Sequence, residues 1–184
     1  MQLAITGLGG RGTDHMESYA ALPAARIVAL CDVNQAARER GAALVKRLTG
    51  SEPRTYSDLR ELLASKDVDA VSLATPNHWH ALQTIWACRA GKDVSVEKPA
   101  SHNIHEAACM VEAARKHNRI VQLGTQSRSD ATIREAMDLL RSGASGQIHL
   151  AKGLCFKRRR SIGNKPDGPV PPGLDWNEFL GPAP

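Results

Sequence analysis

Residues 2–12 read QLAITGLGGRG, and this stretch decides the fold. Its first part, LAIT, is a short apolar run, which is typical of a buried strand. The run leads directly into the pattern Gly7-x-Gly9-x-x-Gly12, and a helix is expected to begin at about Arg11. A strand, a glycine turn and a helix in this order form the context in which the pattern indicates a dinucleotide-binding turn.

Each glycine of the turn has its own expected task. Gly7 allows the tight turn, Gly9 lets a pyrophosphate approach the backbone, and Gly12 lets helix and strand pack closely. The N–H groups and the positive dipole end of the helix then favour phosphate. The apolar run 27–31 ends in Asp32, whose carboxylate can accept hydrogen bonds from a ribose and would repel a 2′-phosphate. We therefore predict an NAD site that prefers NAD over NADP; the alternative for Asp32 is a helix-capping carboxylate.

Composition and length limit the class of protein. The chain has 184 residues, 42% of them hydrophobic and 23% charged, which is typical of a soluble globular protein with one domain and the start of another. No apolar run approaches the length of about 18 residues that a membrane span needs, and the N-terminus lacks a signal peptide. We expect a cytoplasmic protein without a membrane partner, or an exported one if an upstream signal has been removed.

The spacing of the cysteines and histidines argues against a metal site. The one basic run in the sequence does not have the composition of a nucleic-acid site. No C-x-x-C spacing occurs, so buried free thiols are favoured over disulfides or zinc binding at Cys31, Cys88, Cys109 and Cys155. His78 and His80 would not share a helix face, so no metal is expected. Much of the net charge of +5 comes from residues 157–160, KRRR. Without interleaved aromatic residues, such a run is typical of a solvated loop rather than a nucleic-acid site.

Strand-like and helix-like segments alternate along the chain as far as residue 140. Further strands are expected at 25–31, 68–74, 93–96 and 120–123. Helices are expected at 11–22, 35–48, 58–63, 79–90, 104–116 and 131–140, with Asn34 and Ser57 as N-caps of the second and third; residues 50–54 are expected to form a loop. The alternation predicts an α/β, Rossmann-type doubly wound parallel sheet with right-handed crossovers.

Ligands of such sheets bind beyond the carboxyl ends of the strands. Besides the glycine turn and Asp32, three segments are expected there: residues 75–80 (TPNHWH), 97–99 (EKP) and 124–128 (GTQSR). After Gly146 the character of the chain changes, and residues 147–156 predict a longer strand before a basic and then Pro- and Gly-rich stretch. We expect residues 1–145 to form the NAD-binding domain and residues 146–184 to be the incomplete start of an α+β domain for substrate binding and oligomerisation.

The spacing of the glycine turn, Asp32, Thr75-Pro76-Asn77-x-x-His80 and Glu97-Lys98-Pro99 resembles the Gfo/Idh/MocA family. Its members are NAD(P)-dependent sugar and polyol oxidoreductases. The resemblance covers about residues 2–128, and Glu-Lys-Pro is its most specific element. The stretches GTQ (124–126) and WNEFLGPAP (176–184) resemble a bacterial subgroup of the family, many members of which are exported.

The resemblance implies roles for residues at matching positions. The cofactor-binding residues would be Gly7, Gly9, Gly10, Arg11, Gly12, Asp32, Thr75, Pro76, Asn77, His80, Glu97, Lys98 and Gln126. Lys98 would also reach the substrate hydroxyl, and Arg128 would lie near the substrate. The family's acid/base pair and the large sheet of its oligomer interface are expected beyond Pro184. The parent enzyme is therefore expected to be a homo-oligomer, and residues 1–184 alone are expected to be inactive.

Several alternatives stay open. A lysine at the cleft can lower the pKa of a substrate hydroxyl or stabilise an alkoxide, but Lys98 could also be a solvated surface lysine. His80 could position the cofactor or serve as a cap or packing residue. Trp79 and Trp86 are more typical of core or interface packing than of a sugar platform.

Three functions remain possible for the sequence. The first is hydride transfer between the hydroxyl of a sugar or polyol and the nicotinamide. The second is an NAD-dependent glycosidase that oxidises the sugar transiently, so that the cofactor is recycled within each turnover. The third, for residues 1–184 alone, is an NAD-binding module without turnover. Substrate identity is not encoded in any of the motifs above.

Overall fold

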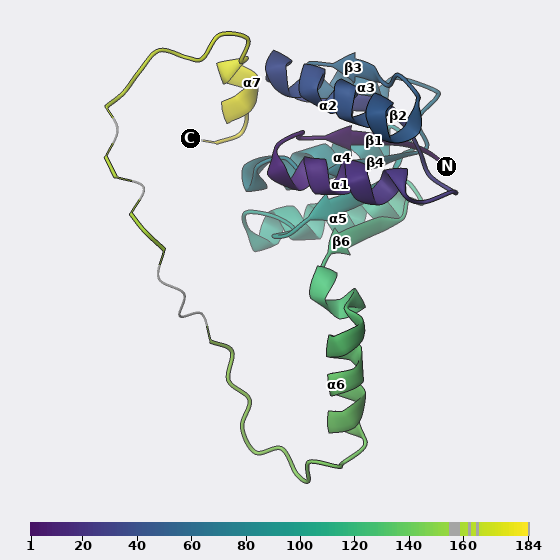
Figure 1. Ribbon diagram of the computed structural model, residues 1–184, viewed down its shortest axis with the longest axis vertical. Coiled ribbons are helices and arrows are strands. Elements are labelled where there is room, and N and C mark those ends of the chain that lie inside the picture. The colour runs from purple at the N-terminus through teal and green to yellow at the C-terminus, as the bar shows by residue number, and fades with distance from the viewer. Residues whose placement is uncertain (155–158, 162, 165, 184) are drawn as a thin grey trace. The chain divides into compact units, whose positions relative to one another are not determined.

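Six parallel strands form one sheet in the order β3-β2-β1-β4-β5-β6 (Figure 1). This computed structural model describes residues 1–154, 159–161, 163–164 and 166–183. The strands are β1 (Gln2–Thr6), β2 (Arg26–Cys31), β3 (Arg54–Tyr56), β4 (Ala70–Leu73), β5 (Asp93–Glu97) and β6 (Val121–Gly124). The α/β, Rossmann-type fold predicted from the sequence is confirmed.

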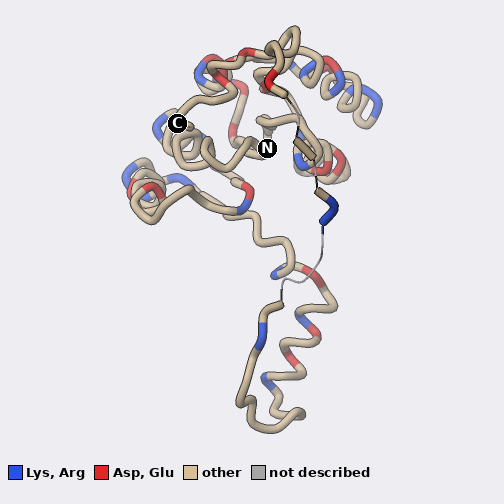
Figure 2. Tube along the Cα trace, turned by 90° about the vertical axis from the view of Figure 1, so that its left-hand side faces the viewer, with Lys and Arg blue, Asp and Glu red and all other residues tan. Residues whose placement is uncertain are grey.

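Helices connect the strands. They are α1 (Gly10–Ala20), α2 (Gln35–Thr49), α3 (Leu59–Leu63), α4 (His80–Arg89), α5 (Ile104–Lys116), α6 (Ala131–Arg141) and α7 (Trp176–Leu180), with short 3₁₀ helices η1 (Asn77–Trp79) and η2 (Gln126–Ser129). Basic and acidic residues are interspersed along them (Figure 2). Within the described ranges, none of the helices combines the length and the apolar character needed to cross a bilayer.

The chain divides into two compact units. The first comprises Met1–Gly124 together with Val170–Pro184, and the second comprises Thr125–Pro169. The second unit contains η2 and α6, and Asp130 caps α6 by accepting a hydrogen bond of 3.0 Å from the N–H of Ile133. The division predicted from the sequence, into residues 1–145 and 146–184, stays a prediction.

The core of the first unit has two layers because side chains alternate across a strand. Leu3 and Ile5 of β1 face one layer, which also holds Met16 of α1 and Val45 of α2. The neighbouring Ala4 faces the other layer, built from the sheet and from α3, α4 and α5. Both faces are thus covered by helices, as a parallel sheet requires.

The cysteine prediction is confirmed where the structure describes it. Cys31 and Cys88 are buried free thiols and Cys109 is a partly buried one, whereas Cys155 and part of the basic run 157–160 lie outside the described residues. Burial raises the pKa of the Cys31 and Cys88 thiols, which keeps both protonated at neutral pH.

Three local predictions were wrong. Arg54, expected as the last residue of a loop, instead begins β3, because residues 54–56 pair with Ala29–Cys31 of β2. The N-cap of α3 is Asp58, whose carboxylate accepts from the N–H of Arg60, and not Ser57. The described residues 147–154 form no strand, since within the described chain no neighbouring strand takes up their backbone hydrogen bonds. Residues 176–180 form α7, a helix that the sequence analysis does not predict.

Candidate cofactor site

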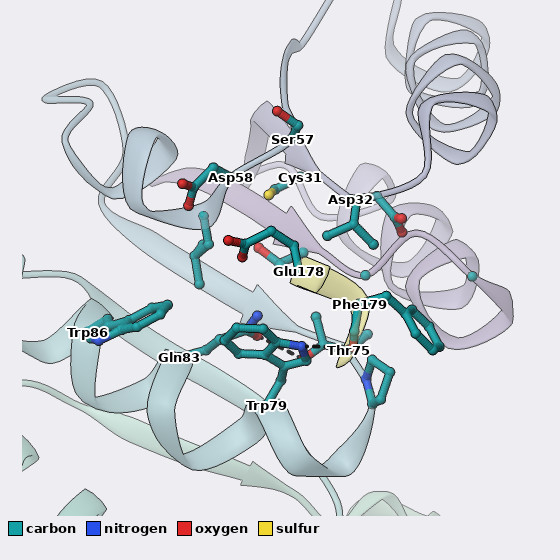
Figure 3. A pocket seen from close by; sticks show the side chains of 17 residues that line it. Cys31, Asp32, Ser57, Asp58, Thr75, Trp79, Gln83, Trp86, Glu178 and Phe179 are labelled. Atoms are coloured by element: carbon teal, nitrogen blue, oxygen red, sulfur yellow. Dashed lines mark hydrogen bonds between the residues drawn. The ribbon is translucent and has the colours of Figure 1, made fainter. Parts of the chain in front are cut away.

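A pocket of about 280 Å³ lies in the first unit at the carboxyl ends of β1, β2 and β4 (Figure 3). The order of the strands reverses between β1 and β4, which is where ligands bind in open α/β sheets. Five predicted site residues line the pocket: Gly7, Gly9, Asp32, Thr75 and Pro76. The other predicted residues of the first unit lie outside its lining: Gly10, Arg11, Gly12, Asn77, His80, Glu97 and Lys98.

The glycine turn is built as its spacing predicts. Gly7 has a φ of 82°, and a Cβ on it would lie 2.6 Å from the backbone nitrogen of Thr75. A Cβ on Gly12 would lie 1.9 Å from the carbonyl oxygen of Gly7. Gly9 and Gly10 differ, because a Cβ on either would meet no atom within 4 Å. Gly7 and Gly12 are therefore required by close packing within the fold. Gly9 and Gly10 instead leave the backbone accessible to a ligand.

Asp32 joins the end of β2 to the glycine turn. Its Oδ2 accepts a hydrogen bond of 2.7 Å from the N–H of Leu8, and its Oδ1 accepts one of 2.8 Å from the N–H of Asn34. Each carboxylate oxygen keeps a further lone pair, so Asp32 can still accept from ligand hydroxyls. The capping role belongs to Asn34, which accepts from the N–H of Ala37 and confirms the predicted start of α2.

The turn after β4 is held by a buried histidine. The ring of His80 is 1% exposed; its Nε2 lies 2.9 Å from the carbonyl oxygen of Thr75 and its Nδ1 lies 2.6 Å from that of Pro99. Both ring nitrogens thus face backbone carbonyls, and neither is directed into the pocket. The hydroxyl of Thr75 donates to Oε1 of Gln83 at 2.8 Å. Of the two alternatives for His80, this geometry favours packing; cofactor contact stays a prediction.

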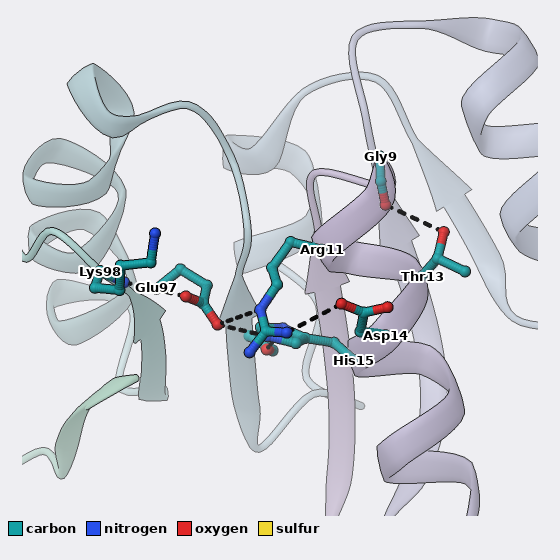
Figure 4. A network of polar contacts seen from close by, with 8 residues as sticks. Gly9, Arg11, Thr13, Asp14, His15, Glu97 and Lys98 are labelled. Carbon is teal, nitrogen blue, oxygen red and sulfur yellow. Dashed lines mark hydrogen bonds and ion pairs between the residues drawn. The ribbon is translucent and has the colours of Figure 1, made fainter. Parts of the chain in front are cut away.

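A polar network connects α1 to the end of β5 (Figure 4). Nε of Arg11 donates to Oε1 of Glu97 at 2.8 Å, and its Nη1 lies 3.0 Å from Oδ2 of Asp14. Nε2 of His15 lies 3.0 Å from the same Glu97 oxygen, and Nδ1 of His15 lies 2.9 Å from the Ser72 hydroxyl. The Arg11 guanidinium is thus directed at Glu97. The predicted contacts of Arg11 with pyrophosphate and of Glu97 with ribose stay predictions.

Lys98 follows β5 and is exposed. Its backbone N–H donates to Oε2 of Glu97 at 3.2 Å, and the peptide bond to Pro99 is cis. Among the described residues its ammonium group has no hydrogen-bond partner, and it points away from the network (Figure 4). Gln126 and Arg128 lie in η2, within the second unit, and their predicted roles stay predictions.

Sequence reasoning missed part of the pocket wall. Trp79 and Trp86 pack together with ring centroids 5.9 Å apart, as their packing role predicts, but they also line the pocket. Glu178 and Phe179 of α7 line it as well. The distinctive stretch WNEFLGPAP was the available signal, but it does not say where residues so distant along the chain will fold back.

An arginine connects two acidic residues at the pocket. Arg60 Nη2 lies 2.7 Å from Oδ2 of Asp58 and 2.9 Å from Oε1 of Glu178. Hydrogen bonding from the Arg60 guanidinium holds the pKa of Asp58 below its usual value. Asp58 is therefore a carboxylate at neutral pH, and with Asp32 and Glu178 it makes this wall acidic. An acidic wall disfavours an additional phosphate group.

These features fit a dinucleotide. The open backbone at Gly9 and Gly10 leads into the first turn of α1, whose N–H groups have no partners within the helix. The position of Asp32 suits its predicted role as the ribose acceptor, which stays a prediction. The pocket volume of about 280 Å³ is close to the lower end of small-molecule sites, roughly 300 Å³, which suits one half of a dinucleotide.

Comparison with known proteins agrees with this geometry. A family model described as an oxidoreductase family with an NAD-binding Rossmann fold, Gfo/Idh/MocA, matches residues 1–125. The chain is 34% identical over 167 residues to a glycosyl hydrolase family 109 protein of Saccharopolyspora erythraea, covering 88% of this chain and 36% of that protein.

Two solved structures are similar in fold. Scyllo-inositol dehydrogenase of Lactobacillus casei with bound NAD(H) and scyllo-inositol matches with a TM-score of 0.72 and 28% identity, over 79% of this chain and 42% of that one. Myo-inositol 2-dehydrogenase of Lactobacillus plantarum matches with a TM-score of 0.72 and 28% identity, over 80% and 43%. The present chain thus spans less than half of the length of these relatives. It belongs to the Gfo/Idh/MocA family of oxidoreductases, whose Rossmann fold binds NAD.

Proposed function

We propose that the protein oxidises a hydroxyl group of a sugar or polyol, with NAD as the hydride acceptor. The observation that carries the proposal is the position of Lys98. The Glu97 carboxylate accepts hydrogen bonds from Nε of Arg11 on α1 and from the backbone N–H of Lys98. The exposed Lys98 therefore directly follows the residue that contacts the helix after the glycine turn. Inositol dehydrogenases among the structural relatives support a polyol as substrate. A further relative, the WlbA dehydrogenase of Bordetella pertussis in complex with NADH and UDP-GlcNAcA, supports a sugar.

Different residues of the chain would bind the cofactor, contact the substrate and position these groups. NAD, when bound, supplies the electrophilic carbon that accepts a hydride. The Gly9–Gly10 backbone and Asp32 would hold phosphates and ribose, with Gly7, Gly12, Thr75 and Pro76 shaping the site. The Lys98 ammonium would stabilise negative charge on the substrate oxygen as the hydroxyl passes its proton to the base of the acid/base pair that the family resemblance implies. Arg11, Glu97 and His80 would keep the two turns in place, Asn77 would border the cofactor, and Gln126 and Arg128 would lie at its nicotinamide side and at the substrate.

The test is a screen of free sugars and polyols with NAD and the complete gene product, followed by NADH absorbance. Steady formation of NADH with at least one member of these classes is expected. If the protein binds NAD but oxidises none of them, the proposed substrate class is wrong.

A second candidate is an NAD-dependent glycosidase, favoured by the glycosyl hydrolase family 109 relative. Transient oxidation would then assist cleavage of a glycosidic bond, and the hydride would return to the sugar within the same turnover. Release of the aglycone from an aryl glycoside, dependent on NAD but without net NADH, would select this candidate. NADH accumulation with free sugars would select the first.

A further inference from the structure

Residues 170–183, here called the returning segment, fold back onto the first unit beside Asp32. The N–H of Gln35 donates to the carbonyl oxygen of Gly173 at 2.9 Å, and the N–H of Asp175 donates to that of Val33 at 3.2 Å. Asn34 and Leu174 form an isolated antiparallel bridge. The segment is therefore attached by backbone hydrogen bonds directly after the ribose-binding position.

The other end of the returning segment is attached to the start of α4. The indole N–H of Trp79 donates to the carbonyl oxygen of Phe179 at 3.3 Å, and Nε2 of His78 lies 3.1 Å from the same oxygen. A Cβ on Gly181 would lie 2.0 Å from the indole of Trp79, so only a glycine allows this approach. The segment thus contacts both the residues after β2 and the start of α4, and its Glu178 and Phe179 line the pocket (Figure 3).

We propose that the returning segment is the outer wall of the site for the adenosine half of NAD, with Phe179 as the aromatic contact of the adenine. This proposal rests on the assignment of the pocket to NAD. Phe179 lines the pocket, and 36% of its surface is accessible. One face of its ring stacks on Trp176, with centroids 5.4 Å apart, so the opposite face is the one that would meet a planar base. Aromatic side chains stack on nucleobases through faces of this kind.

The chemistry of the pocket favours adenosine over the carbohydrate. Asp32, the ribose acceptor, lines it, whereas Lys98, the proposed partner of the substrate hydroxyl, does not. Much of the remaining wall is apolar, with Leu59, Trp79 and Trp86 in addition to Phe179. A purine has apolar faces that such a wall can cover.

Because the segment forms part of the site, binding of the cofactor and docking of the segment stabilise each other. The adenosine half cannot leave along this side without displacement of the segment. We therefore expect the segment to slow dissociation as well as to raise affinity.

The test uses calorimetry and the fluorescence of the pocket tryptophans with three probes: NAD, ADP-ribose and nicotinamide mononucleotide. Phe179→Ala is expected to raise the Kd of NAD and of ADP-ribose about tenfold, in line with the loss of a stacked base, and to leave that of nicotinamide mononucleotide unchanged. Phe179→Tyr should retain most of the affinity. Gly181→Ala, which displaces the segment from Trp79, should raise the two Kd values at least as much.

Gly168→Ala is the matched control, because a Cβ there would meet no atom within 4 Å. An unchanged Kd for NAD in Phe179→Ala and Gly181→Ala would overturn the proposal. A lower Kd would overturn it too, because the segment would then obstruct the pocket.

Hydrogen exchange on the unaltered protein gives a test that no folding defect can affect. ADP-ribose should slow amide exchange in residues 173–181, and equal exchange with and without it would contradict the proposal. The two proposals fail separately. NAD binding that depends on Phe179 without carbohydrate oxidation refutes only the proposed function, whereas NAD binding independent of Phe179 refutes only the outer wall.

Discussion

Nδ1 of His80 lies 2.6 Å from the carbonyl oxygen of Pro99, so one buried ring joins the turn after β4 to the turn after β5. The other ring nitrogen faces Thr75, which lines the pocket. Through this side chain the turn at Thr75 is connected to the turn that contains Lys98 and Pro99. A histidine can do this because its two nitrogens point in divergent directions from a rigid ring.

Replacement of His80 by Ala should therefore reduce stability. It leaves a cavity and removes the contacts of a buried ring with the carbonyl oxygens of Thr75 and Pro99, so we expect the free energy of unfolding to fall by about 2–4 kcal/mol. Denaturant unfolding measures the change. His102→Ala, at an exposed histidine, should have little effect. Full stability of His80→Ala with a large loss of NAD affinity would instead support the cofactor contact considered from the sequence.

Asp32 should determine the preference for NAD. In Asp32→Asn the charge that repels a 2′-phosphate is lost, and hydrogen bonds from the ribose become weaker. We expect NAD to bind about tenfold or more weakly and the ratio of NADP to NAD affinity to rise, since hydrogen bonds to charged groups are worth about 1.5–3 kcal/mol. Calorimetry with both cofactors checks this. Asp138→Asn, on the exposed surface of α6, is the control, and tighter binding of NADP than NAD by the unaltered protein would refute the role of Asp32.

Gly10 and Gly12 should respond differently to replacement by alanine. Gly12→Ala puts a methyl group 1.9 Å from the carbonyl oxygen of Gly7, so it should lower the free energy of unfolding by several kcal/mol. Gly10→Ala meets no protein atom within 4 Å and should leave the fold stable. Thermal unfolding of both variants without cofactor distinguishes them. Equal stability would mean that α1 shifts freely relative to β1.

Asp58 should make stability depend on pH. Its pKa in the folded chain lies below the ordinary value of 3.8, because Arg60 hydrogen-bonds to the carboxylate. The stabilisation is therefore complete above about pH 4 and is lost as the pH falls through the folded-state pKa. At pH 7, Asp58→Ala should cost about 1–2 kcal/mol through the lost cap of α3.

Asp58→Asn separates the effect of the lost charge from the effect of the lost cap. An asparagine can still cap α3 but carries no charge, so it should cost less than the alanine. Urea unfolding between pH 7 and pH 3 should show the unaltered protein approaching Asp58→Asn as the pH falls. A constant difference between them across this range would contradict the assigned pKa shift.

Lys98 should affect turnover more than cofactor binding. In the complete gene product, Lys98→Met should lower kcat by a factor of about 100 or more, in the range typical of a lost acid–base group, while the Kd of NAD changes little. Lys116→Met, at an exposed lysine in the last turn of α5, is the matched control. Unaltered turnover in Lys98→Met would remove this residue from the mechanism.

Local sequence determined most of the Rossmann unit. The glycine spacing at residues 7–12, the caps and the apolar periodicity each act over a few residues, and α5 (Ile104–Lys116) agrees with its predicted bounds. The position of Asp32 could be predicted for the same reason, because it follows directly from the end of a buried strand. The motif at residues 97–99 identified the family, and the match to residues 1–125 confirms it.

Only the tertiary structure decided which groups meet across long separations in the chain. Residues 54–56 become a strand because β2 offers its edge, and Arg11 faces Glu97, 86 residues away, rather than open solvent. The wall formed by Phe179 likewise depends on Trp79, 100 residues earlier. Propensity and periodicity describe how a short segment arranges its own backbone. They do not specify which distant surface will supply the partner that completes a hydrogen bond or buries a ring, and the pocket is made of such partners.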